Sequence, residues 1–269
     1  MRGGKKSVVD DMERLKQRRE DRKNKGDKQE YFKSDDYIKL IEKKKKGLNL
    51  KEENHITSDN SKLFVCVRKR PIFKKEINGG EIDCVSVVNP KILVHECKIK
   101  IDGITRFIED QEFLFDNTFN DNQQTSEVYR YSVYPNIPLI LNGGTVTCFA
   151  YGQTGSGKTF TMKGIQNYSI DSLFDTAAKM GDMKFKFYVS FFEIYGGRLF
   201  DLLNNKNKLQ VLEDKNQKVQ IFGLEEKEAK DPDDMQNIID IANSIRTTHN
   251  TVTNEVSSRS HAICNVSRI

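Results

Sequence analysis

Thr-Val-Thr-Cys-Phe-Ala-Tyr-Gly-Gln-Thr-Gly-Ser-Gly-Lys-Thr, at residues 145–159, is the stretch of sequence that decides the fold. Its last eight residues, 152–159, match the G-x-x-x-x-G-K-[ST] pattern of a phosphate-binding loop. The compact apolar run 145–150 before the loop predicts a β-strand, and residues 158–163 predict the start of a helix. Strand, loop and helix in this order are the context that the pattern requires, so we expect an α/β domain with a nucleotide site.

The residue types in this loop suit the chemistry of a phosphate chain. Glycines let backbone N–H groups turn inward without a Cβ clash, and the N-terminus of the following helix adds further donors. Lys158 is expected to reach the β- and γ-phosphates, and the Thr159 hydroxyl is expected to bind Mg²⁺. The predicted nucleotide-binding residues of the loop are Gly152, Gln153, Thr154, Gly155, Ser156, Gly157, Lys158 and Thr159.

The base that accompanies the phosphates is predicted to be adenine. Asn-Lys-Gly-Asp at residues 24–27 matches the letters of the guanine-specific N-K-x-D pattern. That match lies upstream of the phosphate loop, in a charged segment with no apolar strand before it, so we interpret it as chance. Nothing else in the sequence specifies guanine, and ATP is the expected nucleotide.

A second polar cluster follows near the end of the chain, where residues 254–261 read Asn-Glu-Val-Ser-Ser-Arg-Ser-His. Two serines, an asparagine and an arginine packed together can contact a γ-phosphate, its Mg²⁺ and an attacking water. Alone, this cluster would equally describe a polar loop. Combined with the phosphate loop, it indicates a nucleotide-sensing segment.

These motifs together resemble the kinesin motor domain. In that family the switch I segment reads N-x-x-S-S-R-S-H and the phosphate loop reads F-A-Y-G-Q-T-G-S-G-K-T, and the latter is present at 149–159. Arg-Lys-Arg-Pro at 68–71 resembles the family's R-x-R-P, and residues 192–203 resemble its F-x-E-I-Y-N-E-x-x-x-D-L-L strand and helix. The resemblance covers roughly residues 62–269 and implies a P-loop NTPase-type α/β motor fold, with a central mostly β sheet flanked by helices.

The resemblance also implies a role for each matching residue in a microtubule-stimulated ATPase that uses ATP and Mg²⁺. Thr159 and Ser258 would lie on the Mg²⁺ side, and Asn254 and Ser257 would face the γ-phosphate and the attacking water. Arg259 resembles the arginine that pairs with a switch II glutamate. The nucleotide base would be lined from the R-x-R-P segment, by Arg68, Arg70 and Pro71.

Residues 94–102, Val-His-Glu-Cys-Lys-Ile-Lys-Ile-Asp, resemble the V-H-E-P-K-x-K-V-D loop of the internal-motor, microtubule-depolymerising kinesins, the kinesin-13 family. The family's tip, which presses on tubulin, would here be Lys100, Ile101 and Asp102, with isoleucine in place of valine. The resemblance therefore implies microtubule depolymerisation at filament ends. Because tubulin surfaces are acidic, a block of four lysines should also contact tubulin, namely Lys43, Lys44, Lys45 and Lys46.

Two alternatives to a depolymerase stay open. The first is a translocating kinesin, against which the tip loop and the basic N-terminal segment count. The second is a non-catalytic tubulin-binding module, because the D-x-x-G-x-E pattern of switch II does not occur and no aspartate follows Asp240. We therefore expect a motor fold that is incomplete at its C-terminus, with weak or no ATPase activity in these 269 residues alone.

Charge divides the chain into two expected parts. Residues 1–60 hold 18 Lys and Arg against 13 Asp and Glu, whereas residues 61–269 hold 26 of each. We expect 1–61 to be a basic neck or linker, helical or disordered, and 62–269 to be the N-terminal part of the motor domain. The resemblance implies a cytoplasmic, cytoskeletal protein and leaves a homodimer open; no membrane or nucleic-acid partner is expected.

The remaining patterns predict local structure and the redox setting. The five cysteines are scattered with no C-x-x-C pair, which favours a reducing compartment. Helices are expected at 34–46, at 126–141 with interruptions at Pro135 and Pro138, and from 231 onward with Met235, Ile238, Ala242 and Ile245 buried. Residues 51–61 suggest a linker. Strands are expected at 63–67, 84–88, 92–101, 112–115, 185–191 and 261–269, and as a hairpin around 214–216.

Overall fold

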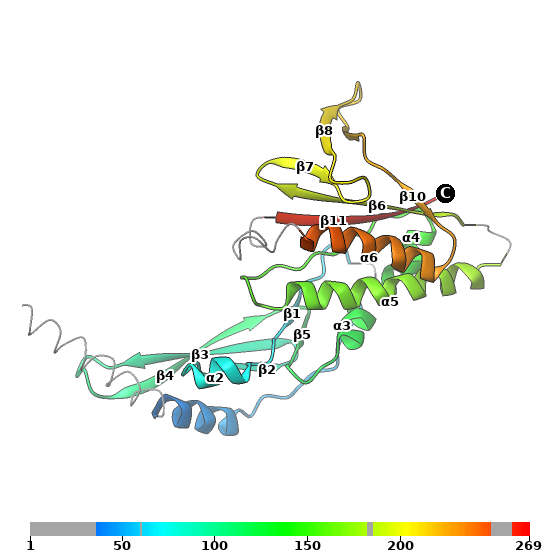
Figure 1. Ribbon diagram of the computed structural model, residues 1–269. Helices are drawn as coiled ribbons and strands as arrows, with labels where there is room; N and C mark the ends of the chain where they lie inside the picture. Colours follow the sequence, from blue (N-terminus) through cyan, green and yellow to red (C-terminus); the bar gives the residue numbers. More distant parts are fainter. Residues whose placement is uncertain (1–35, 60, 182–184, 249–259) are drawn as a thin grey trace, which may run out of the picture. The chain divides into compact units, whose positions relative to one another are not determined.

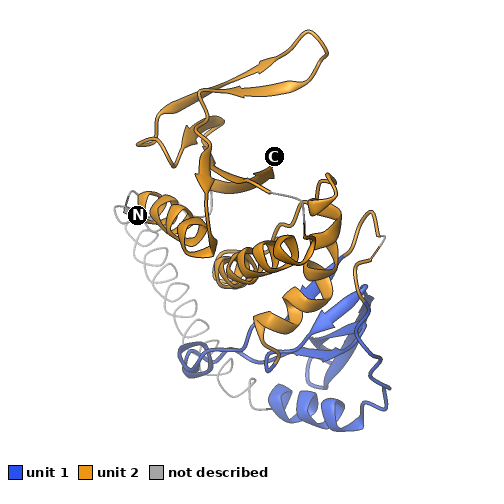
Figure 2. Ribbon diagram, turned by 90° about the vertical axis from the view of Figure 1, so that its right-hand side faces the viewer, with its two compact units in different colours: residues 1–56, 65–122 blue, residues 57–64, 123–269 orange. Residues whose placement is uncertain are grey.

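The computed structural model describes residues 36–59, 61–181, 185–248 and 260–269. The chain forms two compact units, unit 1 with residues 1–56 and 65–122 and unit 2 with residues 57–64 and 123–269 (Figure 2). Among the described residues, no helix is both long and apolar enough to cross a membrane.

Unit 1 is built around two small sheets. Strand β1 (Cys66–Arg68) pairs in parallel with β5 (Asn117–Phe119). Strands β2 (Val85–Val88), β3 (Lys91–Ile99) and β4 (Arg106–Leu114) form an antiparallel sheet in that order. The short helix α2 (Lys74–Asn78) follows β1, and a further helix covers residues 36–47 (Figure 1).

The helix at 36–47 is part of the packed structure of unit 1. Ile41 is buried on its inner face, and the Tyr37 hydroxyl donates a hydrogen bond to the carbonyl of Lys98 on β3 (3.2 Å). The sequence predicts a helix at 34–46 from the helical spacing of Tyr37, Leu40 and Ile41, and the observed helix at 36–47 confirms it within the described residues. Two of its lysines form ion pairs, which the sequence pattern did not predict.

The polar segment 51–61 carries more structure than a linker needs. The side-chain amide of Asn117 exchanges two hydrogen bonds with the backbone of Ile56 (3.0 and 2.7 Å). The His55 ring stacks on Phe119, with ring centroids 4.7 Å apart. In unit 2, Ser58 is held by backbone and hydroxyl hydrogen bonds to the carbonyls of Tyr131 and Ser132. These contacts hold the segment through both its backbone and its side chains, which a polar composition does not reveal.

Unit 2 combines a six-stranded sheet with helices. The helices are α3 (Thr125–Ser132), the 3₁₀ helix η1 (Tyr134–Asn136), α4 (Ile137–Leu141), α5 (Lys158–Lys179) and α6 (Pro232–Thr248). The strands are β6 (Phe187–Tyr195), β7 (Arg198–Asp201), β8 (Lys208–Glu213), β9 (Val219–Phe222), β10 (Lys227–Ala229) and β11 (Ser260–Arg268). Strand β6 is central, because it pairs with β7, β10 and the whole length of β11.

The core of unit 2 lies between this sheet and the helices α4, α5 and α6. Alternate residues of β6 point into it, including Phe187, Val189 and Phe191. Helix α5 contributes Ile170 and Leu173. Helix α6 runs beside β6, and α5 runs beside α6 (Figure 1). Burial of these apolar side chains is the main stabilising term for the unit.

Several sequence predictions for unit 2 are confirmed. The helix expected at 126–141 is divided as Pro135 and Pro138 predict, since each proline stands at the start of a new helical segment. Strands β8 and β9 form the hairpin expected around 214–216. Helix α6 buries Met235, Ile238 and Ala242, as its spacing predicts, and Ile245 is partly buried.

Two local predictions are wrong. Residues 145–150 form no strand, and Phe149 within them is 77% exposed. A strand needs a hydrogen-bonded neighbour, and within the described part of the chain none pairs with this segment. The helix expected near 201–203 is instead strand β7 followed by a turn. Asp201, which is fully buried, shapes that turn by accepting hydrogen bonds from the amides of Leu203 (2.8 Å) and Glu225 (2.7 Å).

We predict that Met235→Ala destabilises unit 2 by about 2–5 kcal/mol, because Met235 is fully buried in the core and its loss leaves a cavity. Ile241→Ala is the matched control on the same helix. Ile241 is 44% exposed, so its substitution should change the free energy of unfolding by only about 0.5 kcal/mol. Urea denaturation of the full chain measures both; equal effects would contradict the described packing of α6.

Candidate functional site

The phosphate loop at 152–159 is held closed by its own lysine. The Lys158 ammonium donates hydrogen bonds to the carbonyls of Gly152 and Gln153, both at 2.8 Å. The amide of Ser156 donates to the carbonyl of Gln153 (3.2 Å) and tightens the same turn. The loop therefore holds a positive charge next to its own backbone carbonyls.

Glycine is required at two positions of this loop. Gly157 stands just before α5 with a φ of 94°, in the left-handed region that side chains disfavour. Gly152 has a φ of 154°, a conformation that side chains rarely adopt, and a Cβ there would lie 2.6 Å from the Ser156 hydroxyl oxygen, which would have to move. Gly157 supplies no side-chain cap to the first turn of α5, and the N-terminus of a helix attracts an anion.

The loop fits a nucleotide phosphate with Mg²⁺. Thr159 lies in the first turn of α5 with an exposed side chain, next to Lys158. Within residues 36–59, 61–181, 185–248 and 260–269, no three His, Cys, Asp or Glu side chains gather as a metal site. Mg²⁺ at a nucleotide site is usually held by few protein ligands together with substrate phosphates and water, and the Thr159 hydroxyl is an oxygen ligand of that kind.

The predicted switch I residues lie outside the described residues, namely Asn254, Ser257, Ser258 and Arg259. The residue after them, Ser260, begins β11 and is buried. Its hydroxyl accepts a hydrogen bond from Arg246 near the end of α6 (3.4 Å). Both flanks of the segment are therefore joined within unit 2.

A buried carboxylate supports this connection. Glu193 on β6 has a side chain only 4% exposed, and it lies 3.5 Å from Arg246 Nε and 3.1 Å from Lys206 Nζ. Sequence reasoning missed these three residues. One signal was present: strand alternation places Glu193 on the same face as Phe191 and Val189, so a charge on the inward face required a partner.

The R-x-R-P segment lies in unit 1. Arg68 ends β1, opposite Phe119 of β5. Arg70 makes a bidentate pair with Glu76 (3.0 and 2.6 Å), and its guanidinium stacks on Phe73, 4.3 Å from the ring centroid. The hydrogen bonds that Arg70 donates to Glu76 lower the pKa of Glu76, and the same bonds raise the pKa of Arg70.

Arg70 therefore has a local structural partner besides any nucleotide contact. Glu76 also accepts a hydrogen bond from the amide of Phe73 (2.7 Å), which completes the cap of helix α2. Arg70 and Glu76 together fix the chain just after Pro71. The sequence prediction for Arg68, Arg70 and Pro71 as base-lining residues stays a prediction.

The loop at 100–105, between β3 and β4, is a rigid turn organised by Asp102. Its carboxylate accepts hydrogen bonds from the Thr105 hydroxyl and from the amides of Ile104 (2.9 Å) and Thr105 (2.8 Å). These bonds, that from the Thr105 hydroxyl first, lower the pKa of Asp102. The amide of Lys100 donates to the carbonyl of Thr105 (2.8 Å) and closes the base of the turn.

The turn presents apolar side chains to solvent. Ile101 is fully exposed and Ile104 is 83% exposed, while Lys100 is also exposed. An exposed apolar cluster on a rigid turn is typical of a contact surface. Of the predicted tip residues, Asp102 shapes the turn, whereas Lys100 and Ile101 are free to contact a partner.

The lysine block at 43–46 divides in the same way. Lys44 pairs with Asp110 (2.9 Å) and Lys45 pairs with Asp83 (2.9 Å). Lys43 and Lys46 are exposed. Burial alone would raise the pKa of Asp110, but hydrogen bonds from His95 and Lys44 outweigh it and lower that pKa. Lys44 and Lys45 thus make internal contacts.

Comparison with known proteins identifies the family. A family model described as the kinesin motor domain matches residues 68–267. The chain belongs to the kinesin motor-domain family. A fast kinesin, solved in a study of its ATPase mechanism and interactions with microtubules, is 29% identical with a TM-score of 0.68. That match covers 77% of this chain and 59% of the fast kinesin, so the chain spans 59% of that protein's length.

The kinesin assignment confirms the fold predicted from the phosphate loop. The chain has the mixed α/β fold of a kinesin motor, with sheets flanked by helices.

We predict that Asp102→Ala opens the turn at 100–105. The variant loses the carboxylate that accepts from both amides, so hydrogen exchange at Ile104 and Thr105 should rise about tenfold, as expected for one lost hydrogen bond. Lys100→Ala is the control, since it keeps every bond of the Asp102 carboxylate. Unchanged exchange in Asp102→Ala, measured by mass spectrometry or NMR, would contradict this role.

Proposed function

We propose that the protein containing this chain is an ATP-dependent microtubule motor of the kinesin-13 type, which uses ATP hydrolysis to depolymerise microtubules at their ends. Membership of the kinesin family supports the nucleotide and filament partners. The exposed, rigid tip at 100–105 is the observation that carries the depolymerase assignment. On this proposal the protein is cytoplasmic and associated with the cytoskeleton, and a homodimer of the full-length protein stays open.

In the nucleotide part of the proposal, the chain binds the phosphates of ATP through residues 152–159. The Lys158 ammonium now bonds two neutral carbonyls, which charged phosphate oxygens can replace in stronger, charge-assisted bonds. Thr159, with Ser258, would hold Mg²⁺, which supplies charge neutralisation at the phosphates when bound. Asn254 and Ser257 would orient the attacking water, and Arg259 would pair with a switch II glutamate.

In the filament part, the tip contacts tubulin through Ile101 and Lys100. An apolar side chain that is fully exposed on a rigid turn can be buried in a complementary groove with little loss of backbone entropy. Lys100 and the exposed Lys43 and Lys46 would add attraction to the acidic tubulin surface, which weakens with salt.

The nucleotide part predicts that Lys158→Ala lowers the affinity for ATP about 10–100-fold, since it removes charge-assisted hydrogen bonds to phosphate. Lys163→Ala is the control, because Lys163 is an exposed lysine one turn further along α5. Binding of a fluorescent ATP analogue to the full-length protein measures both variants. Equal affinities would remove Lys158 from the phosphate site.

The filament part predicts that Ile101→Ser slows microtubule depolymerisation at least about tenfold, because the apolar contact at the tip is lost. ATP binding should not change, since Ile101 is fully exposed on the turn at 100–105 and is not one of the predicted nucleotide-binding residues. Ile104→Ser is the matched control, an exposed isoleucine of the same turn, and should have the smaller effect. Loss of stabilised microtubules, followed by light microscopy with the full-length protein, is the measurement.

The same assay separates the alternatives. Movement along the filament without shortening would favour a translocating kinesin. Filament binding that is independent of ATP, and that falls when Lys43 and Lys46 are neutralised, would favour the non-catalytic tubulin-binding module. Either result would replace the depolymerase proposal.

A further inference from the structure

Lys45, in the last turn of helix 36–47, is used inside unit 1. Its ammonium donates one hydrogen bond to the Asp83 carboxylate (2.9 Å) and another to the Asp83 carbonyl (3.0 Å). Its side chain is 30% exposed, less than the 46% of its neighbour Lys44. Two bonds to one residue tie the end of this helix to the chain just before β2.

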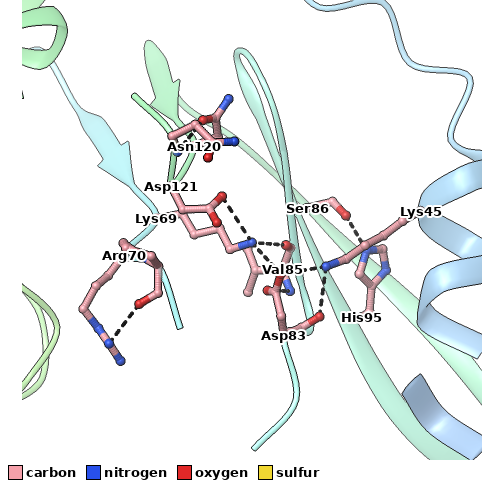
Figure 3. Close-up of polar contacts among 11 residues, drawn as sticks. Lys45, Lys69, Arg70, Asp83, Val85, Ser86, His95, Asn120 and Asp121 are labelled. Atoms are coloured by element: carbon pink, nitrogen blue, oxygen red, sulfur yellow. Dashed lines mark hydrogen bonds and ion pairs between the residues drawn. The ribbon is translucent and has the colours of Figure 1, made fainter. Parts of the chain in front are cut away.

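The same carboxylate holds a second lysine. The Lys69 ammonium lies 2.8 Å from the Asp83 carboxylate, donates to the carbonyl of Val85 (3.0 Å), and lies 3.7 Å from Asp121 (Figure 3). The Lys69 side chain is only 14% exposed, so its charge depends on these partners. The Lys69 amide also donates a hydrogen bond to the carbonyl of Phe119 (2.8 Å), which joins the residue after β1 to the end of β5.

Asp83 is therefore one carboxylate shared by two ammonium groups. Burial raises the pKa of Asp83, but hydrogen bonds from Lys69 and then Lys45 outweigh this effect and lower it. The carboxylate is charged at neutral pH and attracts both lysines at once. If the Lys45 ammonium is removed, its hydrogen bonds to the Asp83 carboxylate and carbonyl are lost. Asp83 then remains bonded to Lys69, but fewer contacts hold the Asp83 side chain in place.

Lys69 connects this network to the nucleotide segment. It stands between Arg68 and Arg70 in the R-x-R-P segment at 68–71, so a displacement of Lys69 moves both neighbours through the backbone. The far side of the segment is held separately, by the pair between Arg70 and Glu76. Asp83 is thus the residue that links helix 36–47, through Lys45, to Lys69 in the segment 68–71.

We propose that Asp83 and Lys45 are positioning residues for nucleotide binding. Through Lys69 they hold helix 36–47 and residues 68–71 in one arrangement, so docking of the helix and binding of the nucleotide base stabilise each other. This inference rests on the proposed function, because it takes residues 68–71 to face the base of ATP. It assigns Lys45 to the nucleotide site and not to tubulin.

Lys44 provides the matched control. It is the neighbouring lysine of the same helix, and it makes an ion pair of the same length, 2.9 Å, with Asp110. Asp110 in turn bonds the His95 ring (2.8 Å), which also bonds Ser86 (2.8 Å), and none of these bonds involves Asp83 or Lys69. Lys44→Gln therefore weakens docking of the helix without touching Asp83.

The experiment compares Lys45→Gln, Asp83→Asn and Lys44→Gln in the full-length protein. A fluorescent ATP analogue gives the dissociation constant, and hydrogen exchange gives the protection of residues 36–47. Lys45→Gln should weaken nucleotide binding about fivefold, whereas Lys44→Gln should leave it within about twofold. Both variants should lower the protection of the helix. By reciprocity, the nucleotide should raise the protection of the helix in the unmodified protein and lose this effect in Lys45→Gln.

The double variant tests whether the two residues act together. Lys45→Gln combined with Asp83→Asn should weaken binding no more than Asp83→Asn alone. If Asp83→Asn fails to fold, the pair Lys45→Gln and Lys44→Gln still decides the question. Reduced helix protection with unchanged nucleotide affinity in Lys45→Gln overturns the inference and leaves the proposed ATP site intact. An unmodified protein that binds no ATP analogue overturns the proposed function, and this inference with it.

Discussion

Helix α5 has to begin at a glycine-made turn and pack its apolar side chains into the core, and the rest of unit 2 depends on that constraint. At its start, the left-handed Gly157 turns the chain into the helix just before Lys158. Further along, Ile170 and Leu173 are buried with residues of β6 and α6. Because the core fixes the helix, it also fixes where the amides and the ammonium point. The position of the phosphate loop therefore depends on packing outside the loop, where α5 contacts residues of β6 and α6.

Many of the charged side chains in this chain make ion pairs inside a unit, so the net charge alone does not show which of them can contact a partner. The basic excess of residues 1–60 suggests a solvated surface for an acidic partner, yet Lys44 and Lys45 neutralise carboxylates of unit 1. Conversely, the buried Glu193 lies between Lys206 and Arg246. Net charge predicts partners only after such internal pairs have been subtracted. Here the subtraction leaves Lys43 and Lys46 as the exposed part of the lysine block.

Local signals predicted local structure well. The two prolines divide the helical region at 126–141, the hairpin of β8 and β9 follows its turn residues, and Met235 lies buried where the helical period places it. The errors involve distant partners. An apolar run such as 145–150 becomes a strand only if another strand pairs with it, and no pattern within the run shows that. The same holds for Lys45 and Asp83, which are 38 residues apart.

The tip at 100–105 shows why a short motif should not be treated as one unit. The Asp102 carboxylate accepts hydrogen bonds from the amides of Ile104 and Thr105, so it shapes the turn from within. Ile101 makes the opposite use of its position, with its whole side chain in solvent. Valine and isoleucine differ there by one methylene, about 0.8 kcal/mol when buried. Exchange at that position therefore tunes a contact, whereas exchange of the aspartate removes the geometry on which the contact depends.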